Sequence, residues 1–482
     1  MTCKRARISI PGPVSGVPVD GELTGGAEGN RTPGLNSAIV ALYQLSYSPV
    51  ASRQCSRATV GFARLGSLPW RPMATPRVPG FRRGGATSVE QLLLATTAAA
   101  CHPEPGARVS QLVENAPDGV IRDLPALAAA HRVDGCVHAV LEQTGGAAAD
   151  VLDRLAAGRR QAAAHHLLVR DVLARVAPVL DAAGVPWLVF KGPVLSSSVY
   201  CDPGMRRYSD LDVLVPPDRF ADAVVAMESA GFENPITSWA PQAYFRAGAI
   251  AFDVDGISVD LHWHVMYKYQ DRRWYHIDPE QLFARRHTIE VGGRVCATFD
   301  DVDTVFHLAL HAAREGCDRL VWLKDIELAI ATGQPDLDEL VRRSRDARCA
   351  PAIGIALARS KWALGAEVPD DIVAALVGRV WPLIVRAVAS FDDVGSTRRR
   401  SSPGTWMTRQ TRMSLPRTAI WAVRRVSEHR SQRRVDRGFR RGFDPHNYTP
   451  AELARNQVDR VTFLAFVRDW RSELTPSPDL VK

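Results

Sequence analysis

The chain has 482 residues, enough for two or three domains, and 46% hydrophobic and 23% charged residues, as in ordinary globular proteins. It contains no run of about 18 uncharged apolar residues, and no apolar segment follows the basic residues of its N-terminus, so we expect neither a membrane span nor a secretory signal. The formal net charge is +8, and the eight cysteines show no CxxC spacing, which favours reduced thiols in a cytoplasmic protein over a disulfide framework or a zinc ribbon.

Residues 1–85 are rich in Gly, Pro, Ser and Arg and lack sustained hydrophobic periodicity, which predicts disorder. Within them, Gly29–Pro49 can be written back into codons as the complement of the T-arm and D-arm of a tRNA gene. We therefore expect that the start codon was assigned too far upstream and that Met73 is nearer the true start. A genuine flexible tail is the alternative, and under either interpretation we place no function in this segment.

The next part of the chain has the pattern of a helical region. Between Ser88 and Ala183, apolar residues recur every three or four positions among many alanines, which is typical of packed helices. Gly184 follows at the position where a glycine commonly ends a helix. We therefore predict an N-terminal helical region that covers residues 86–184.

The hydrophobic pattern then changes to that of a small mixed sheet. Short, dense apolar runs predict buried strands at 185–190 and 211–215, and Pro193 suits the first turn of a helix. Two hairpins are predicted from the turn signals Asp255-Gly256 and Gly292-Gly293. The fold class is therefore α+β, with the sheet in residues 185–299.

Helical periodicity returns in residues 300–395, where we expect Asp325 to pair with a neighbouring basic group. Residues 396–482 form an Arg-rich C-terminal region, in which Thr397–Arg441 contains fourteen arginines and no lysine. A stretch of this kind is compatible with nucleic-acid binding, with a membrane surface or with packing on its own domain. The pattern leaves these alternatives open.

Asp210 and Asp212 stand on either side of one leucine at the start of a predicted buried strand. Side chains two apart in a strand point to the same side, so the two carboxylates would lie a few ångströms apart and repel each other. The arrangement is costly unless one carboxylate is protonated or a cation lies between them. The pair therefore predicts a metal site, against the ordinary alternative of a solvent-exposed DxD.

Two further features belong to the same predicted sheet unit. Asp260, in a strand of the first hairpin, supplies a third carboxylate that can complete a two-metal Mg²⁺ site and help to activate an attacking hydroxyl. Lys191 and Gly192 end the first strand before a helix, where a glycine lets phosphate approach backbone N–H groups. Together these residues predict in-line displacement at phosphorus. The alternatives are an edge-strand charge for Asp260 and a surface strand end for Lys191.

Several histidines lie in or beyond this unit. Strand alternation places His262 and His264 on the same face as Asp260, so His262 either lines the site or is a hydrogen-bonded structural histidine. A zinc site that combines them with His307 has no distinguishing spacing. His307 and His311, four residues apart on an apolar helix, are typical of histidines that pack in a core with their hydrogen bonds satisfied. The helix follows the sheet, where a second domain would close a cleft, so a place in the site is the alternative.

Three motifs carry a resemblance to a known family. They are VPWLVFKGPVLSSSVYCDPGMRRYSDLDVLV, VDLHWHV and FHLALHAAREGCDRLVWLKDIELAI, in this order. Over residues 88–365 the chain resembles the uncharacterised nucleotidyltransferase family of the polymerase-β-like nucleotidyltransferase superfamily. The resemblance implies a small nucleotidyltransferase palm flanked by helices, with Mg²⁺ and a nucleoside triphosphate (NTP) as ligands. In it, Asp210 and Asp212 match the metal-binding pair and Asp260 the third acid.

The resemblance also implies residues that hold the triphosphate. Arg206 matches a basic residue that commonly precedes the acid pair in this family. Lys191 and Gly192 stand where many superfamily members have Gly-Ser, and a longer gap separates them from Asp210. The Lys-Gly pair and the longer gap both depart from the superfamily pattern. Because both concern phosphate binding, the way in which this chain holds the phosphates stays open.

On this basis we expect an Mg²⁺-dependent enzyme that transfers a nucleoside monophosphate (NMP) from an NTP to a hydroxyl or phosphate acceptor and releases pyrophosphate. The acceptor is a small molecule or a protein side chain, and nucleic acid is a further partner if Thr397–Arg441 binds it. The alternative is a non-catalytic nucleotide- or nucleic-acid-binding module, regulatory or toxin–antitoxin-like, that keeps the palm. The expected catalytic metal ligands are Asp210, Asp212 and Asp260, and the expected nucleotide-binding residues are Lys191, Gly192 and Arg206.

Overall fold

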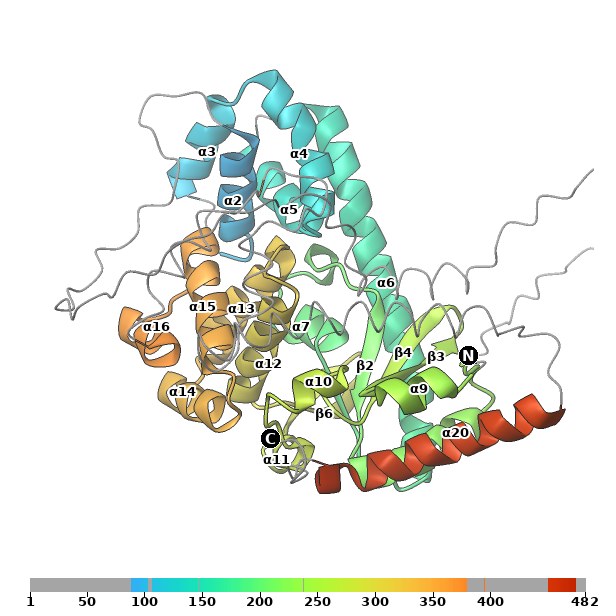
Figure 1. Ribbon diagram of the computed structural model, residues 1–482. Helices are drawn as coiled ribbons and strands as arrows, with labels where there is room; N and C mark the ends of the chain where they lie inside the picture. Colours follow the sequence, from blue (N-terminus) through green and yellow to red (C-terminus); the bar gives the residue numbers. More distant parts are fainter. Residues whose placement is uncertain are drawn as a thin grey trace, which may run out of the picture. The chain divides into compact units, whose positions relative to one another are not determined.

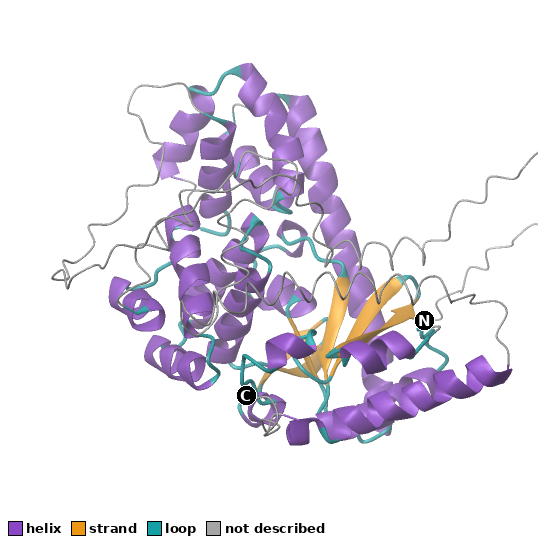
Figure 2. Ribbon diagram, in the orientation of Figure 1, coloured by secondary structure: helices purple, strands orange, loops and turns teal. Residues whose placement is uncertain are grey.

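The computed structural model describes residues 88–102, 106–145, 147–236, 238–378, 394 and 450–473. They all fall in one compact unit, residues 65–482, and form many helices and a small mixed sheet (Figures 1 and 2), which confirms the predicted α+β class. The predicted disordered segment, residues 1–85, and the arginine cluster Thr397–Arg441 lie outside the described residues. The proposed division into domains stays a prediction.

Among the described residues five helices precede the sheet: α2 (Val89–Ala99), α3 (Gly106–Glu114), α4 (Asp118–Ala130), α5 (Asp134–Thr144) and α6 (Ala149–Ala182). α2 begins at a capping box, in which Ser88 and Gln91 each accept a hydrogen bond from the other's backbone N–H. The chain leaves α6 at Gly184, which has a φ of +61° and confirms the predicted helix end. α6 contacts α4 and α5 as well as α8 and two strands of the sheet, so it connects the helical region to the sheet (Figure 1).

The sheet has four strands in the order β1-β2-β4-β3: β1 (Leu188–Phe190), β2 (Asp210–Leu214), β3 (Ala249–Val254) and β4 (Ile257–His262). β2 runs parallel to β4, and the other neighbours are antiparallel. The predicted turn between β3 and β4 is confirmed, since Asp255 and Gly256 both have positive φ, as a tight two-residue hairpin requires. The parallel register places Asp212 beside Asp260.

Shorter elements connect the strands and form a second hairpin. Between β1 and β2 lie α7 (Gly192–Ser198) and η1 (Pro203–Met205), and between β2 and β3 lie η2 (Pro217–Arg219), α8 (Phe220–Ser229) and α9 (Ala240–Phe245). After β4 come α10 (Tyr269–Arg272), α11 (Pro279–Ala284), β5 (His287–Val291) and β6 (Arg294–Thr298). β5 and β6 pair around Gly292 and Gly293, as predicted.

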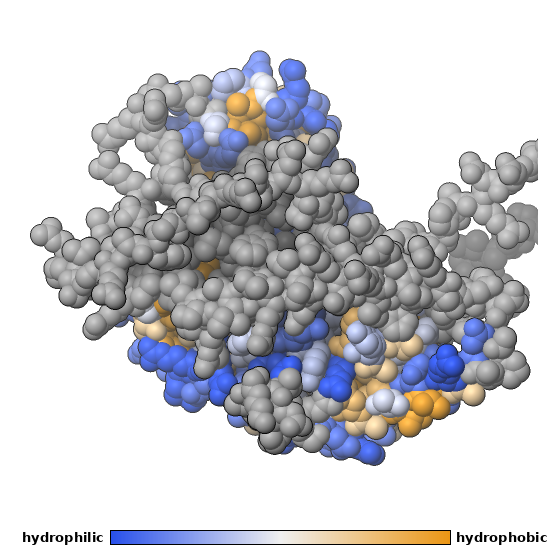
Figure 3. Space-filling model, viewed as in Figure 1, coloured by the Kyte–Doolittle hydropathy of each residue, from blue (hydrophilic) through white to orange (hydrophobic). Residues whose placement is uncertain are grey.

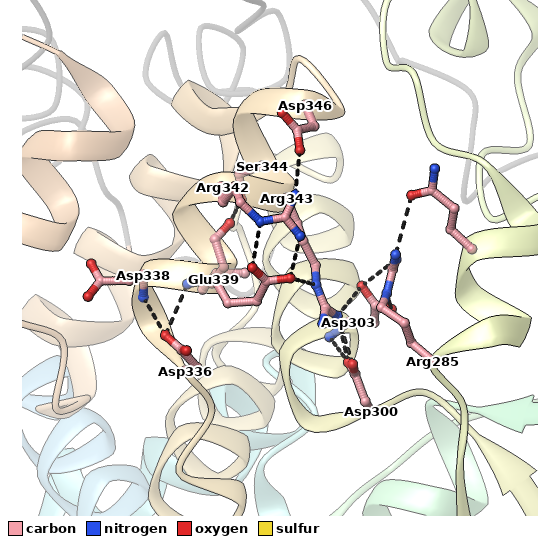
Figure 4. Close-up of polar contacts among 12 residues, drawn as sticks. Arg285, Asp300, Asp303, Asp336, Asp338, Glu339, Arg342, Arg343, Ser344 and Asp346 are labelled. Carbon is pink, nitrogen blue, oxygen red and sulfur yellow. Dashed lines mark hydrogen bonds and ion pairs between the residues drawn. The ribbon is translucent and has the colours of Figure 1, made fainter.

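The helices after the sheet are α12 (Asp301–Arg314), α13 (Leu320–Gly333), α14 (Leu337–Asp346), α15 (Ala350–Leu364) and α16 (Asp370–Val377). Their apolar faces share one hydrophobic cluster with α2, α4 and α5. An ion-pair network ties α14 to the start of α12 (Figure 4): Arg343 donates to Asp300 and contacts Asp303, which also accepts from Arg285 after α11. Glu339 accepts from Arg343 and orients it.

Helix α20 (Pro450–Arg468) and the short η3 (Trp470–Glu473) end the described part of the chain. α20 lies against α8 and α9, where Phe463 is fully buried and the Asn456 side chain accepts a hydrogen bond from the Trp239 N–H. Apolar side chains such as Val458 and Val461 are exposed on α20. Figure 3 shows hydrophobic surface along part of this helix. None of the described helices combines the length and the hydrophobicity that crossing a bilayer requires.

Alternation along β2 and β4 gives the sheet one apolar and one acidic face. The apolar face belongs to a hydrophobic cluster with side chains of α6, α8 and α20, to which the sheet contributes Leu211, Val213, Val259 and Leu261, all fully buried. The residues between these point to the opposite face. That face therefore carries Asp210, Asp212, Asp260 and His262.

Candidate functional site

The acidic face brings two of the predicted carboxylates into one compact group. Asp212 and Asp260 are register partners on neighbouring parallel strands, and they are only 2% and 5% exposed. One ligand atom from each of Asp212, Asp260 and His262 lies within 4.8 Å of the others, so these three residues form a buried group that could hold a metal ion. Asp210, half-buried at the start of β2, lies outside that group but next to it on the same face.

Lys191 reaches this group from the end of β1. Because Phe190 is the register partner of Asp212, the next residue lies at the same edge of the sheet, and its Nζ is 3.1 Å from Oδ1 of Asp212. The Lys191 backbone has a φ of +57°, a left-handed conformation that costs a non-glycine residue on the order of 1–3 kcal/mol. The residue with the strained backbone is therefore the one whose ammonium group lies against Asp212.

The two histidines of the HxH pair have different surroundings. His262 lies at the acids, with Nε2 3.0 Å from Oδ1 of Asp212 and Nδ1 3.4 Å from the carbonyl oxygen of His264. His264 is fully buried and satisfied by backbone: its Nδ1 accepts from the Met266 N–H at 2.9 Å and its Nε2 donates to the Ile277 carbonyl at 3.0 Å. His262 therefore joins the site, and His264 supports the loop that follows β4.

The acids differ in their electrostatics. Burial, together with the charges of Asp210 and Asp212, raises the pKa of Asp260 to about 7, and burial and Asp212 also raise the pKa of Asp210. Burial acts on Asp212 in the same direction, but Lys191 and His262 outweigh it and lower the pKa of Asp212 below its ordinary value. Burial opposes the charge of Lys191, yet the three acids raise its pKa. At Asp210 and Asp260, burial and the repulsion between the acids together therefore outweigh the opposing positive charges.

Gly192 follows Lys191 as the first residue of α7, and it is buried. A Cβ added there would lie 2.7 Å from Cδ2 of Tyr208 and 3.2 Å from the Asp210 carbonyl oxygen. The Tyr208 hydroxyl is in turn held 2.8 Å from Nδ1 of His166 on α6. The close approach of the Tyr208 ring requires a glycine here, and a phosphate contact of its backbone stays a prediction.

Arg206 is engaged by Asp325 of α13, which confirms that Asp325 pairs with a basic group. Nε and Nη2 of Arg206 donate to the two carboxylate oxygens at 2.8 and 2.9 Å, and Nη1 is directed at the Gly192 carbonyl oxygen, 3.4 Å away. The Tyr200 hydroxyl donates to the same carboxylate at 2.8 Å. Arg206 is 6% exposed, so this pair fixes the loop before β2 from the interior. A triphosphate contact of Arg206 stays a prediction.

Replacing Arg206 by alanine is expected to lower the free energy of unfolding by about 3–5 kcal/mol, because the change leaves the Asp325 carboxylate buried without its partner. Urea denaturation measures the loss. Arg342→Ala is the matched control, since Arg342 is 61% exposed and its ion pairs with Glu339 and Asp346 lie at the surface (Figure 4), so it should change stability little. Equal effects of the two substitutions would contradict a structural role for Arg206.

Three further side chains outside the sheet lie close enough to the site for an electrostatic influence, and the sequence assigned none of them firmly. Arg132, in the turn after α4, has a φ of +58°, and its charge acts against the burial that raises the pKa of Asp210. Burial lowers the pKa of His307 and of His311 on α12, and the positive charge of Lys191 lowers each further. The pKa of His311 falls to about 3. Nε2 of His307 has no hydrogen-bond partner in the described part of the chain. The expectation of a satisfied core histidine therefore does not hold for this atom.

The part of the chain that contains the site matches a known protein family. A family model described as "Uncharacterised nucleotidyltransferase" matches residues 119–365, which is 247 of the 482 residues. None of the curated proteins compared with the chain matches it. The matched range runs from within α4 to the end of α15 and contains the whole four-stranded sheet, all three acids and Lys191. The chain therefore belongs to the uncharacterised nucleotidyltransferase family.

Proposed function

We propose that this protein transfers an NMP from an NTP to a hydroxyl or phosphate acceptor, with release of pyrophosphate and dependence on Mg²⁺. One observation carries the proposal: Asp212 and Asp260 meet in register on parallel strands, with Asp210 two residues away on the same face, in a chain of a nucleotidyltransferase family. Paired carboxylates on a rigid sheet suit a reaction whose catalysis is mostly positioning and charge stabilisation.

The donor set fits a hard divalent cation. Carboxylate oxygens are the ligands that Mg²⁺ prefers. The raised pKa of Asp260 reflects burial of its charge and, after that, repulsion by Asp210 and Asp212, which a bound cation would relieve. We assign the metal to Asp210, Asp212 and Asp260, and we assign His262 to orienting Asp212 through their 3.0 Å contact. When bound, Mg²⁺ would neutralise charge on the phosphates and favour ionisation of the acceptor hydroxyl.

The chain's own residues supply the remaining functions. Ser258 donates to Oδ1 of Asp260 at 3.0 Å and fixes its orientation, so we assign the acceptor's proton to the other oxygen, Oδ2. Lys191 would leave Asp212 when nucleotide binds and pair its flexible ammonium group with the triphosphate. Nη1 of Arg206, the guanidinium nitrogen not paired with Asp325, would contact the triphosphate beside the Gly192 backbone.

Label transfer tests the function directly. The full-length protein is incubated with each NTP labelled at the α-phosphate, Mg²⁺ and fractionated cell extract, and labelled products are separated by size and chemical class. We expect transfer by the wild type and by Asp222→Asn, whose acid lies at the surface of α8, and none by Asp260→Asn or after chelation of Mg²⁺. Equal labelling by Asp260→Asn would refute the assignment of the site.

Thermal stabilisation separates the enzyme from the non-catalytic module. A ligand that binds only the folded state raises its apparent stability, so Mg²⁺ with the preferred NTP should raise the melting temperature of the wild type. Stabilisation without label transfer to any acceptor would favour the non-catalytic module. No stabilisation by any NTP would contradict both the enzyme and a nucleotide-binding module, and would leave the nucleic-acid-binding form of the alternative.

A further inference from the structure

Three sulfur atoms meet beside the loop that leads to β2. Cys101 follows α2, Cys201 follows α7 and Met205 ends η1, so helices about a hundred residues apart in sequence bring them together. Sγ of Cys101 lies 3.4 Å and Sγ of Cys201 lies 3.5 Å from Sδ of Met205. The Cys201 backbone N–H also donates to Sγ of Cys101 at 3.2 Å. The thioether is thus the shared neighbour of two free thiols.

The arrangement is unlike a redox pair. Burial and the contact with Cys201 raise the pKa of the Cys101 thiol to about 12, which makes attack by Cys101 as a thiolate slow. The thioether of Met205 has no part in disulfide chemistry, yet it contacts both thiols. Two cysteine sulfurs and a methionine sulfur are instead the donor set that soft metal ions select.

We infer that Cys101, Cys201 and Met205 form a binding site for a soft monovalent metal ion, Cu(I). Zn²⁺ is disfavoured because its structural sites take four ligands, and the thioether is a neutral, soft third donor. At a metal–sulfur distance of about 2.3 Å, three sulfurs around a trigonal ion lie about 4 Å apart. The separation of each cysteine sulfur from Sδ of Met205 would therefore lengthen by only about half an ångström.

One buried cation lies near the proposed site, and one of the proposed ligands is exposed. Binding of one Cu(I) displaces the two thiol protons and leaves one net negative charge on the site. The ammonium group of Lys324, fully buried on α13 and paired with Glu327 at 2.6 Å, acts on the Cys101 thiol in the direction that favours the thiolate, and burial outweighs it. Cys201 is exposed and gives the ion a route from solvent. Met205 directly precedes Arg206, so the ion would also tie α2 to the loop that carries this arginine.

Cys136 lies near the three sulfurs but is not one of the ligands. Its Sγ is directed at the Met205 backbone carbonyl oxygen, 3.5 Å away, and the side chain is fully buried. The site therefore has two thiols, and its ligands come from three different elements. This inference does not depend on the proposed nucleotidyl transfer.

The test is a competition for Cu(I) under anaerobic, reducing conditions. The full-length protein is titrated with Cu(I) in the presence of a chromophoric Cu(I) chelator, and bound metal is counted per chain. Four variants are compared with the wild type: Cys201→Ser, Cys101→Ser, Met205→Leu and the control Cys296→Ala, whose thiol lies on β6. Alkylation followed by mass spectrometry reports which cysteines the metal protects.

We expect the wild type and Cys296→Ala to hold one Cu(I) per chain more than Cys201→Ser and Cys101→Ser, with Cys101 and Cys201 protected together. Loss of even an outer partner of a metal typically costs 10–100-fold in affinity, so Met205→Leu should weaken binding at least about tenfold. Because Cys201 is exposed, its serine variant should fold even if Cys101→Ser does not. Equal binding by the wild type, Cys201→Ser and Met205→Leu would mean adventitious thiol binding and would overturn the inference.

Discussion

Asp212→Asn is expected to reduce kcat for nucleotidyl transfer by about a thousandfold or more. Metal-assisted stabilisation of transition-state charge supplies several kcal/mol, and each 1.36 kcal/mol is a factor of ten. Asparagine keeps the size of the side chain but removes the charge that Lys191 and His262 hold in its ionised form. Initial rates with α-labelled NTP at saturating Mg²⁺ measure the effect.

Two comparisons make this result specific to the site. Asp222→Asn removes a carboxylate from the surface of α8 and should keep the wild-type rate. Lys191→Met should raise the KM for NTP more than it lowers kcat, if Lys191 pairs with the triphosphate after leaving Asp212. An Asp212→Asn variant that folds and keeps kcat within tenfold of the wild type would refute the proposed role of the acid pair.

The sequence predicted the acidic face because strand alternation is local information. Asp210 and Asp212 stand two apart in a strand, as do Asp260 and His262, so each pair shares a face wherever the strand lies. The pairing of β2 with β4 is not local. A slip of one residue would have moved Asp260 to the apolar face, so the sequence offered Asp260 as a third acid, and the family resemblance supported it, without fixing the register.

The contacts that the sequence did not predict join residues far apart along the chain. Arg206 and Asp325 are 119 positions apart, and no periodicity links them, although each was singled out alone. Arg132 lies in the turn after α4, among the N-terminal helices. No sequence pattern predicts its positive φ or its electrostatic influence on Asp210. The pairing of Lys191 with Asp212 required knowing that β1 is antiparallel to β2.

The same cluster links the proposed function to stability. Lys191 and His262 stabilise the ionised form of Asp212, whereas Asp210 and Asp260 have raised pKa values because burial and mutual repulsion disfavour their charge. Without a divalent cation, two of the three acids therefore destabilise the folded protein at neutral pH. Functional groups kept at such a cost are expected in active sites.

Asp260→Asn is accordingly expected to make the metal-free protein more stable at pH 8 while it abolishes transfer. The pKa of Asp260 is raised from its ordinary value of 3.8 to about 7, so the folded state keeps a proton that the unfolded state loses between these pH values. The contribution of Asp260 to the free energy of unfolding of the wild type therefore falls as pH rises from about 4 to about 7, by an amount on the order of 4 kcal/mol. Asparagine keeps an oxygen for the hydrogen bond from Ser258 and removes the charge.

Urea denaturation in chelator-treated buffer at pH 4.5 and pH 8 measures the difference. The variant should gain most of its advantage over the wild type between these two pH values, while Asp222→Asn should show no such change. Added Mg²⁺ should stabilise the wild type at pH 8 and have little effect on Asp260→Asn, since the ion binds the cluster of the folded state. A variant whose stability relative to the wild type is the same at both pH values would show that Asp260 is not the buried, repelled acid on which the proposed site depends.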